Sequence, residues 1–268
     1  MQNSKHHILI LGTVWPEPGS SAAGSRMMQL INLFLEQGWK VSFATAAEKS
    51  AYMFDLVSIG VDTYSIELNN SNFDVFIKEL QPTMVMFDRF MTEEQYGWRV
   101  SEACPDALRI LDTEDLHCLR AARQKGWKEK RELEIVDLMS DVAKREIASI
   151  YRCDISLIIS GAEMQILKDL FKVDASLLHY VPFMLEPLNK EDFNLLPAYS
   201  DRKHFISIGN FLHEPNWNAV QYLKESIWPL IRKQLPDAEL HIYGAYPSQK
   251  VEALHNAKES FLIKGRAE

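Results

Sequence analysis

A run of charged side chains follows one apolar segment of the sequence. Residues 112–120 read DTEDLHCLR and come directly after the apolar run LRIL, at the carboxyl end of an expected strand. Parallel α/β sheets bind ligands at that end. An imidazole there is able to hydrogen-bond a substrate hydroxyl or help to position it. We therefore take His117 and Asp115 as candidate catalytic residues, and Arg120, one helical turn further on, as a candidate substrate-binding residue.

The same residues also fit a purely structural role. Asp112, Thr113 or Asp115 would then cap the start of a long helix, and His117 would be solvated. Arg120 would form a surface salt bridge. The residue types alone leave both interpretations open.

A second candidate is the small-residue loop GTVWPEPGSSAAGSR, residues 12–26, between an apolar run and a helical pattern. A strand, a loop and a helix start are a common phosphate-binding arrangement. Gly19 and Gly24 have the separation of a P-loop, but Ser25 and Arg26 replace its lysine and hydroxyl, and no G-x-G-x-x-G is present. These four residues are candidates for phosphate binding. The alternative is a serine-capped loop whose small residues allow close helix packing.

Ser160 follows the apolar run ISLIIS and precedes a helical pattern. It is a candidate for a ligand hydrogen bond. As the first residue of the sequence S-x-x-E, with Glu163, it also fits a capping box.

The elements that would position these residues alternate along the chain, which is typical of a parallel sheet covered by helices. Short apolar or β-branched runs predict strands at residues 7–11, 40–45, 61–66, 84–87, 108–111 and 155–160. Amphipathic patterns predict helices from near Ser20, over 73–80, over 93–104 and over 161–171. The charged stretch 114–151 predicts one or two more.

Composition excludes several classes of protein. The 268 residues carry a net charge of −8, which argues against broad nucleic-acid binding. The three cysteines show no C-x-x-C spacing, so they suggest neither a disulfide framework nor a zinc site, and a reducing cytoplasm fits best. No apolar stretch approaches the roughly 18 residues of a transmembrane helix. A peripheral membrane contact stays open.

The alternation restarts after a stretch rich in proline and charge. We expect an N-terminal Rossmann-like domain over residues 1–185, a linker over 186–203 and a partial second Rossmann-like domain over 204–268. Strands are predicted at 204–209, 238–244 and 260–265, with helices at 218–235 and 247–257. Three strands and two helices make half of a doubly wound sheet, so we expect the second domain to be truncated.

Four ordered segments resemble the GT-B glycosyltransferases of the retaining, nucleotide-sugar-using type. They are GSSAAGSR after the first strand, DTEDLHCLR, YRCDISLIISGAEMQIL and the passage 205–244. The resemblance implies an α/β protein of two Rossmann-like domains. It also implies sugar transfer from a nucleoside-diphosphate sugar to an unidentified carbohydrate, lipid-linked or small-molecule acceptor, without metal or other cofactor.

The resemblance also assigns roles to residues. The loop containing Gly19 and Arg26 would approach the donor phosphates from the acceptor side. At the start of the second domain, the implied donor-binding residues are Gly209, Asn210, His213 and Asn216. His213 stands where many relatives place a basic diphosphate contact, although a loop histidine beside a proline also fits an exposed, idle position.

Two departures from the family pattern affect the donor site. The junction sequence V-P-N-G-(V/I)-D is replaced by VPFMLEP, and the second domain contains no Glu-x7-Glu segment, which the family places beyond the position of residue 268, so we expect an incomplete donor site. Two rival functions remain. An oxidoreductase or epimerase would need a pyrophosphate fingerprint, and none is present. A non-catalytic binding module on the same scaffold is not excluded, because a fold does not fix a function.

Overall fold

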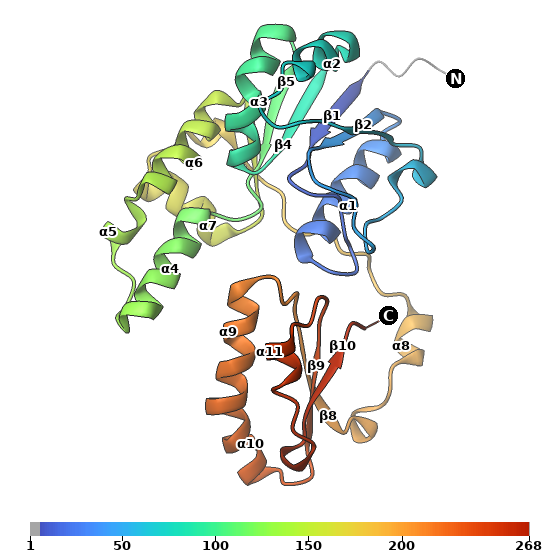
Figure 1. Cartoon of the computed structure of the whole chain (residues 1–268), viewed down its shortest axis with the longest axis vertical. Coiled ribbons are helices and arrows are strands. Elements are labelled where there is room, and N and C mark those ends of the chain that lie inside the picture. The colour runs from blue at the N-terminus through green and yellow to red at the C-terminus, as the bar shows by residue number, and fades with distance from the viewer. Residues whose placement is uncertain (1–5, 268) are drawn as a thin grey trace. The chain divides into compact units, whose positions relative to one another are not determined.

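A computed structural model describes residues 6–267, which divide into two compact units. The first contains the chain up to Met184 except residues 17–25, and the second contains 17–25 and the chain from Leu185 onward. Each unit holds one parallel sheet (Figure 1). Among the described residues, no helix has the length and apolar character needed to cross a bilayer.

The first sheet has seven parallel strands in the order β3-β2-β1-β4-β5-β6-β7. Their bounds are β1 (His7–Leu11), β2 (Lys40–Thr45), β3 (Asp62–Ser65), β4 (Met84–Asp88), β5 (Leu108–Asp112), β6 (Ile155–Ile158) and β7 (Leu178–Tyr180). The chain order reverses between β1 and β4, which is where doubly wound sheets bind ligands. The six strands predicted before residue 160 are confirmed, and β7 is an additional short strand.

Helices cover both faces of this sheet. They are α1 (Ala22–Glu36), α2 (Asn72–Leu80), α3 (Phe90–Ala103), α4 (His117–Glu129), α5 (Ile135–Leu138), α6 (Asp141–Arg152) and α7 (Gly161–Gln165). Alternate residues of β1 point to opposite faces, as the period of a strand requires. Ile8 and Ile10 pack in the core beneath α1, whereas Leu9 and Leu11 belong to the core on the other face.

The charged stretch 114–151 contains three helices rather than the one or two predicted. The break after α4 comes at Lys130, which has a left-handed backbone (φ 54°), and a second break separates α5 from α6. Ser140 caps α6, since its side chain accepts a hydrogen bond from the Ala143 amide. The amphipathic period predicted the helices, but the turns between them carry no glycine or proline signal.

The second unit has a three-stranded parallel sheet in the order β10-β9-β8. The strands are β8 (His204–Ile208), β9 (Glu239–Tyr243) and β10 (Phe261–Gly265), and the helices are α8 (Lys190–Leu195), α9 (Glu214–Tyr222), α10 (Trp228–Gln234) and α11 (Gln249–Glu252). α8 lies within the stretch predicted as a linker. The core of this unit includes Trp228, Ile242 and Phe261. The mixed α/β class and the two parallel sheets agree with the sequence prediction.

Candidate functional site

Two aspartates end adjacent strands at the carboxyl edge of the first sheet. Asp88 ends β4 and pairs in register with Asp112, which ends β5. Both are buried, at 4% and 0% exposed. Asp112 receives three hydrogen bonds from the fully buried Arg26 guanidinium, at 2.8 to 3.1 Å, and Arg26 also donates to the Val181 carbonyl at 2.7 Å. Burial raises the pKa of Asp112, and Arg26 opposes that shift. Arg26 therefore ties α1 to β5 and to the segment after β7.

Asp88 is bonded differently from its neighbour. Its Oδ2 accepts the Thr13 amide at 2.8 Å, and the Thr13 hydroxyl donates to the Asp88 carbonyl at 3.0 Å. Its other carboxylate oxygen has no hydrogen-bond partner among residues 6–267 and lies 3.7 Å from the Arg89 guanidinium. Arg89 has a left-handed φ of 72°, and its backbone amide donates a hydrogen bond to the Asp112 carbonyl at 2.8 Å.

Glu114 is a third buried acid of this edge, 8% exposed, and it also has a left-handed φ, 61°. Burial raises its pKa to about 8, and the charges of Asp88 and Asp112 add to the shift, while Arg89 and Arg26 oppose it. Glu114 therefore holds a proton at neutral pH and is a hydrogen-bond donor in that form. Strained backbone and shifted pKa values both occur often at functional sites.

The pKa of Glu114 predicts a pH dependence of stability. The folded pKa lies above the ordinary value of 4.5, so the wild type should lose stability as pH rises from there to about 8. In that window the loss from one such group is about 1.4 kcal/mol per pH unit. Glu114→Gln has no proton to lose, so its free energy of unfolding should rise relative to wild type between pH 5 and pH 8. Urea denaturation across this range measures the difference. If the free energy of unfolding changes with pH in the same way for the two proteins, Glu114 ionises normally.

His117 begins α4 and is held from two sides. Its amide donates to Glu146 Oε1 at 2.6 Å, and the Cys118 amide donates to Glu146 Oε2 at 2.8 Å, so this carboxylate from α6 caps α4. The His117 Nδ1 atom lies 3.4 Å from Glu146 Oε1 and 3.7 Å from Asp115 Oδ1. The ring of Phe90 meets the imidazole edge-on. These contacts fix the orientation of an imidazole whose side chain is 14% exposed.

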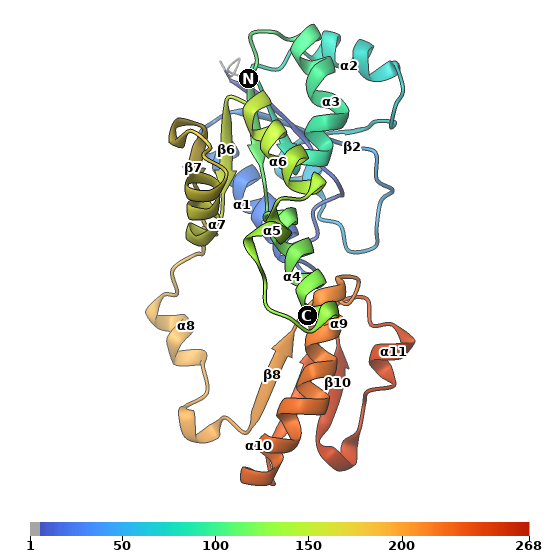
Figure 2. The ribbon, with the colours of Figure 1, turned by 90° about the vertical axis from the view of Figure 1, so that its left-hand side faces the viewer.

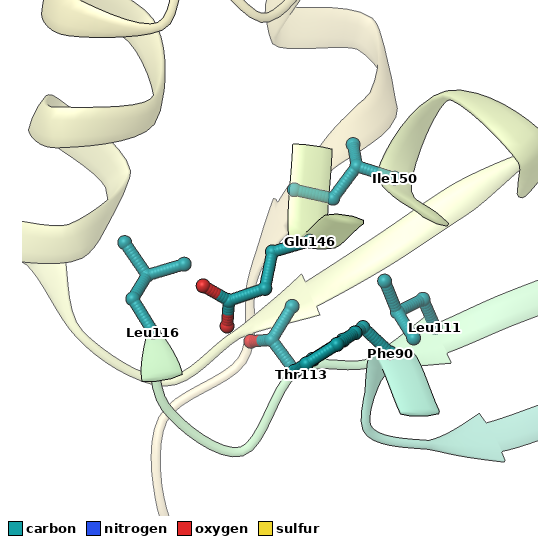
Figure 3. Close-up of a pocket in the computed structure, with 6 residues that line it drawn as sticks. All are labelled: Phe90, Leu111, Thr113, Leu116, Glu146 and Ile150. Carbon is teal, nitrogen blue, oxygen red and sulfur yellow. The ribbon is translucent and has the colours of Figure 1, made fainter. Parts of the chain in front are cut away.

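A small cavity lies beside this cap. Figure 3 shows the Glu146 carboxylate directed between Leu116 and Thr113. The cavity is lined by Phe90, Leu111, Thr113, Leu116, Glu146 and Ile150. The mainly apolar lining keeps water away from the Glu146 carboxylate, which strengthens its hydrogen bonds with the first amides of α4.

Asp115, His117 and Arg120 lie close together in the structure. Asp115 lies between the other two, with Oδ2 3.4 Å from the Arg120 Nε atom. Asp115 and Arg120 each expose more than a third of their side chains, so the salt bridge considered as the alternative for Arg120 is present at the surface.

Ser160 occupies the capping position of α7. Its hydroxyl accepts the Glu163 amide at 3.4 Å. The reciprocal half of the predicted capping box is wrong, because the Glu163 carboxylate instead accepts the Leu116 amide at 3.0 Å. Glu163 therefore holds the loop that leads into α4.

The loop after β1 is held by its own polar groups. Ser21 caps α1, since its hydroxyl accepts the Gly24 amide at 3.0 Å, and the Ser25 hydroxyl donates to the Pro18 carbonyl at 2.9 Å. A Cβ atom on Gly24 would lie 2.5 Å from the backbone of Glu17, so close packing requires glycine here. The serine cap and the close packing that the alternative interpretation expected are both present. Phosphate binding by Gly19, Gly24, Ser25 and Arg26 stays a prediction.

In the second unit, the predicted donor-binding residues lie together, Gly209, Asn210 and His213 between β8 and α9 and Asn216 in the first turn of α9. The Asn216 side chain donates to the Asn210 carbonyl at 2.9 Å, and Asn210 Oδ1 accepts the Leu212 amide at 2.8 Å. His213 is the capping residue of α9. A Cβ atom on Gly209 would lie 3.0 Å from the Asn216 side chain. The loop is thus tightly folded at a helix N-terminus, where backbone amides favour anions.

No family model matches the chain, and no curated protein matches it. Among solved structures, sucrose-phosphate synthase from Thermosynechococcus elongatus aligns over 98% of this chain and 71% of its own, with a TM-score of 0.63 and 14% identity. A lipopolysaccharide outer core galactosyltransferase, WaaB, in its apo form aligns over 98% and 68%, with a TM-score of 0.53 and 12% identity. The fold is that of the GT-B glycosyltransferases.

A third GT-B structure, Arabidopsis thaliana UGT89C1 complexed with UDP-L-rhamnose, covers 99% of this chain and 70% of its own, with a TM-score of 0.52 and 12% identity. Likeness at such identities establishes the GT-B fold and not the activity. The acids Asp88, Glu114 and Glu146 were not predicted as site residues. The strands MVMFD and LRILD both end in aspartate, which was the available signal for Asp88, whereas nothing local indicated the contact between Glu146 and His117.

Proposed function

We propose that the chain is a glycosyltransferase that transfers a sugar from a nucleoside-diphosphate sugar to a hydroxyl-bearing acceptor, with retention. The observation that carries the proposal is the GT-B fold together with polar residues at the carboxyl ends of strands in both units. In the first unit these are Asp115, His117 and Arg120, and in the second they are the residues of the loop before α9.

The proposed chemistry divides between the two sets of residues. In transfer, the bond from the sugar C1 to the diphosphate oxygen breaks and a bond from C1 to the acceptor oxygen forms, while the proton of the acceptor hydroxyl passes to the departing diphosphate. The diphosphate gains negative charge, which the amides at the start of α9 and its capping residue His213 would stabilise. This assigns the stabilisation to protein groups rather than to a metal ion.

His117 would act on the sugar or acceptor hydroxyls. Its ring is oriented by Glu146 and Asp115, as the distances of 3.4 and 3.7 Å indicate. An imidazole fixed in this way loses little freedom when a hydroxyl binds to it. Ser160, in the same unit, would help to position a substrate. Gly19, Gly24 and Ser25 stay proposed phosphate contacts of the other unit, whereas the Arg26 guanidinium is fully buried against Asp112 and would hold the start of α1 rather than contact a substrate.

Calorimetry tests the donor site in the second unit. With a panel of nucleoside-diphosphate sugars, at least one should bind, weakly because the donor site is expected to be incomplete. Asn216→Ala should weaken that binding a further five- to tenfold, on the order of one hydrogen bond, because the loop loses its contact with Asn210. Asn218→Ala on the same helix is the matched control and should bind as wild type does. Binding unaffected by Asn216→Ala would place the donor elsewhere. A panel with no binding and no sugar transfer would refute the proposed function.

A further inference from the structure

The helices α4 and α5 form a hairpin that extends beyond the carboxyl end of the first sheet (Figures 1 and 2). Asp137 fixes its shape: Arg131 donates two hydrogen bonds to this carboxylate, at 2.6 and 2.7 Å, and Lys125 a third at 3.1 Å. The hydrogen bonds from Arg131 hold the pKa of Asp137 well below its usual value. Gly126 allows the chain to close, because a Cβ atom there would lie 3.1 Å from the Arg131 carbonyl. The hairpin is therefore a formed element.

Large apolar side chains are exposed along this hairpin. They are Trp127 (58% exposed), Leu133 (39%), Ile135 (67%), Val136 (69%) and Met139 (50%). The inward face of α4 packs in the core through Cys118, Leu119 and Ala122, so the exposed side chains are not part of that packing. Single exposed apolar residues are ordinary, but several on one projecting element mark an interaction surface.

The charge of the hairpin differs from that of the chain. The hairpin, residues 117–138, contains six basic and four acidic side chains, a net charge of +2 in a protein whose net charge is −8, and all six basic side chains lie in residues 120–131. Arg123, Lys128 and Lys130 are exposed. Basic side chains beside a tryptophan and aliphatic residues are the combination that binds at the surface of an anionic bilayer. The basic side chains would also suit a nucleic acid, but the exposed aliphatic side chains would have no partner in such a complex.

We propose that the α4–α5 hairpin docks the protein on an anionic lipid surface. Trp127, Ile135 and Val136 enter the interface between headgroups and acyl chains, and Met139 adds apolar area. Arg123, Lys128 and Lys130 contact the phosphates of the headgroups. This inference does not depend on the proposed sugar transfer. If both hold, docking brings His117, the first residue of α4, close to a lipid-attached acceptor.

Vesicle flotation of the whole chain tests the docking. The wild type should float with vesicles of phosphatidylcholine mixed with phosphatidylglycerol, and should bind less to phosphatidylcholine alone and at high salt. Lys128→Glu combined with Lys130→Glu should lower partitioning at least tenfold, since each basic residue contributes roughly fivefold. Trp127→Ser combined with Ile135→Ser should also reduce it strongly.

Matched controls are available on the same unit. Trp98 is 53% exposed and the Lys144 side chain is 77% exposed, both outside the hairpin, so Trp98→Ser and Lys144→Glu should float as the wild type does. Circular dichroism checks that each variant is folded, and every changed side chain is exposed. Failure of the wild type to float would overturn the proposal, as would equal losses in the hairpin and control variants. A wild-type dimer that the hairpin changes dissociate would assign the surface to a second copy of the chain instead.

Discussion

Arg26→Met is expected to lower the free energy of unfolding by about 3 to 5 kcal/mol, the usual cost of removing one partner from a buried ion pair. The guanidinium and the Asp112 carboxylate are both fully buried and joined by three hydrogen bonds. Methionine fills much of the space but leaves Asp112 without its positive partner. The carboxylate must then ionise unpaired or take up a proton, and Val181 loses its donor as well. Urea denaturation at neutral pH measures the loss.

The double variant Arg26→Met with Asp112→Leu is the informative control. Replacing both partners removes the unpaired charge, so it should recover most of the stability lost in the single variant. The loss in Arg26→Met should also shrink at low pH, where Asp112 is protonated. A single variant within about 1 kcal/mol of wild type, inside the range of ordinary surface substitutions, would show that the pair does not hold α1 against β5.

The central strands of the first sheet were predictable because each buried strand carries a continuous apolar run. HILIL, KVSFAT and MVMF are buried almost throughout, as strands covered on both faces must be. β7 was missed because it has only three residues, two of them exposed, and therefore lacks that run. Its place in the sheet comes from its pairing with β6, which local sequence does not indicate.

The candidate site was predictable where its residues are close in sequence. Asp115, His117 and Arg120 are adjacent on one loop and one helical turn, so their grouping follows from spacing. Glu146 reaches His117 only because α6 packs against α4, across 29 positions of the chain. Arg26 was expected to contact phosphate from the residue types of its loop. Its burial against Asp112 depends on the fold of the whole unit, which the loop sequence does not contain.

His117→Ala is expected to lower the rate of sugar transfer about 100-fold, the scale on which positioned acid–base groups act. The imidazole would be lost from substrate hydroxyls, while Glu146 would continue to cap α4 through the amides of residues 117 and 118, which the substitution keeps. The loss of unfolding free energy should therefore be only about 1 kcal/mol, from the contact with Phe90. Steady-state kinetics and thermal denaturation of the same preparations measure the two effects.

His179→Ala is the matched control, because His179 lies exposed on β7, and it should change neither quantity. A structural role for His117 predicts the opposite pattern from a functional one: nearly normal transfer by His117→Ala with a large drop in melting temperature. Glu146→Gln separates the two roles further. The amide oxygen still accepts one hydrogen bond from the start of α4, but no negative charge remains beside the imidazole. The rate of transfer should therefore fall, because the His117 ring is less well oriented and has lost its anionic neighbour. If transfer by His117→Ala itself stays within a few-fold of wild type, the imidazole does not act on the reacting hydroxyls.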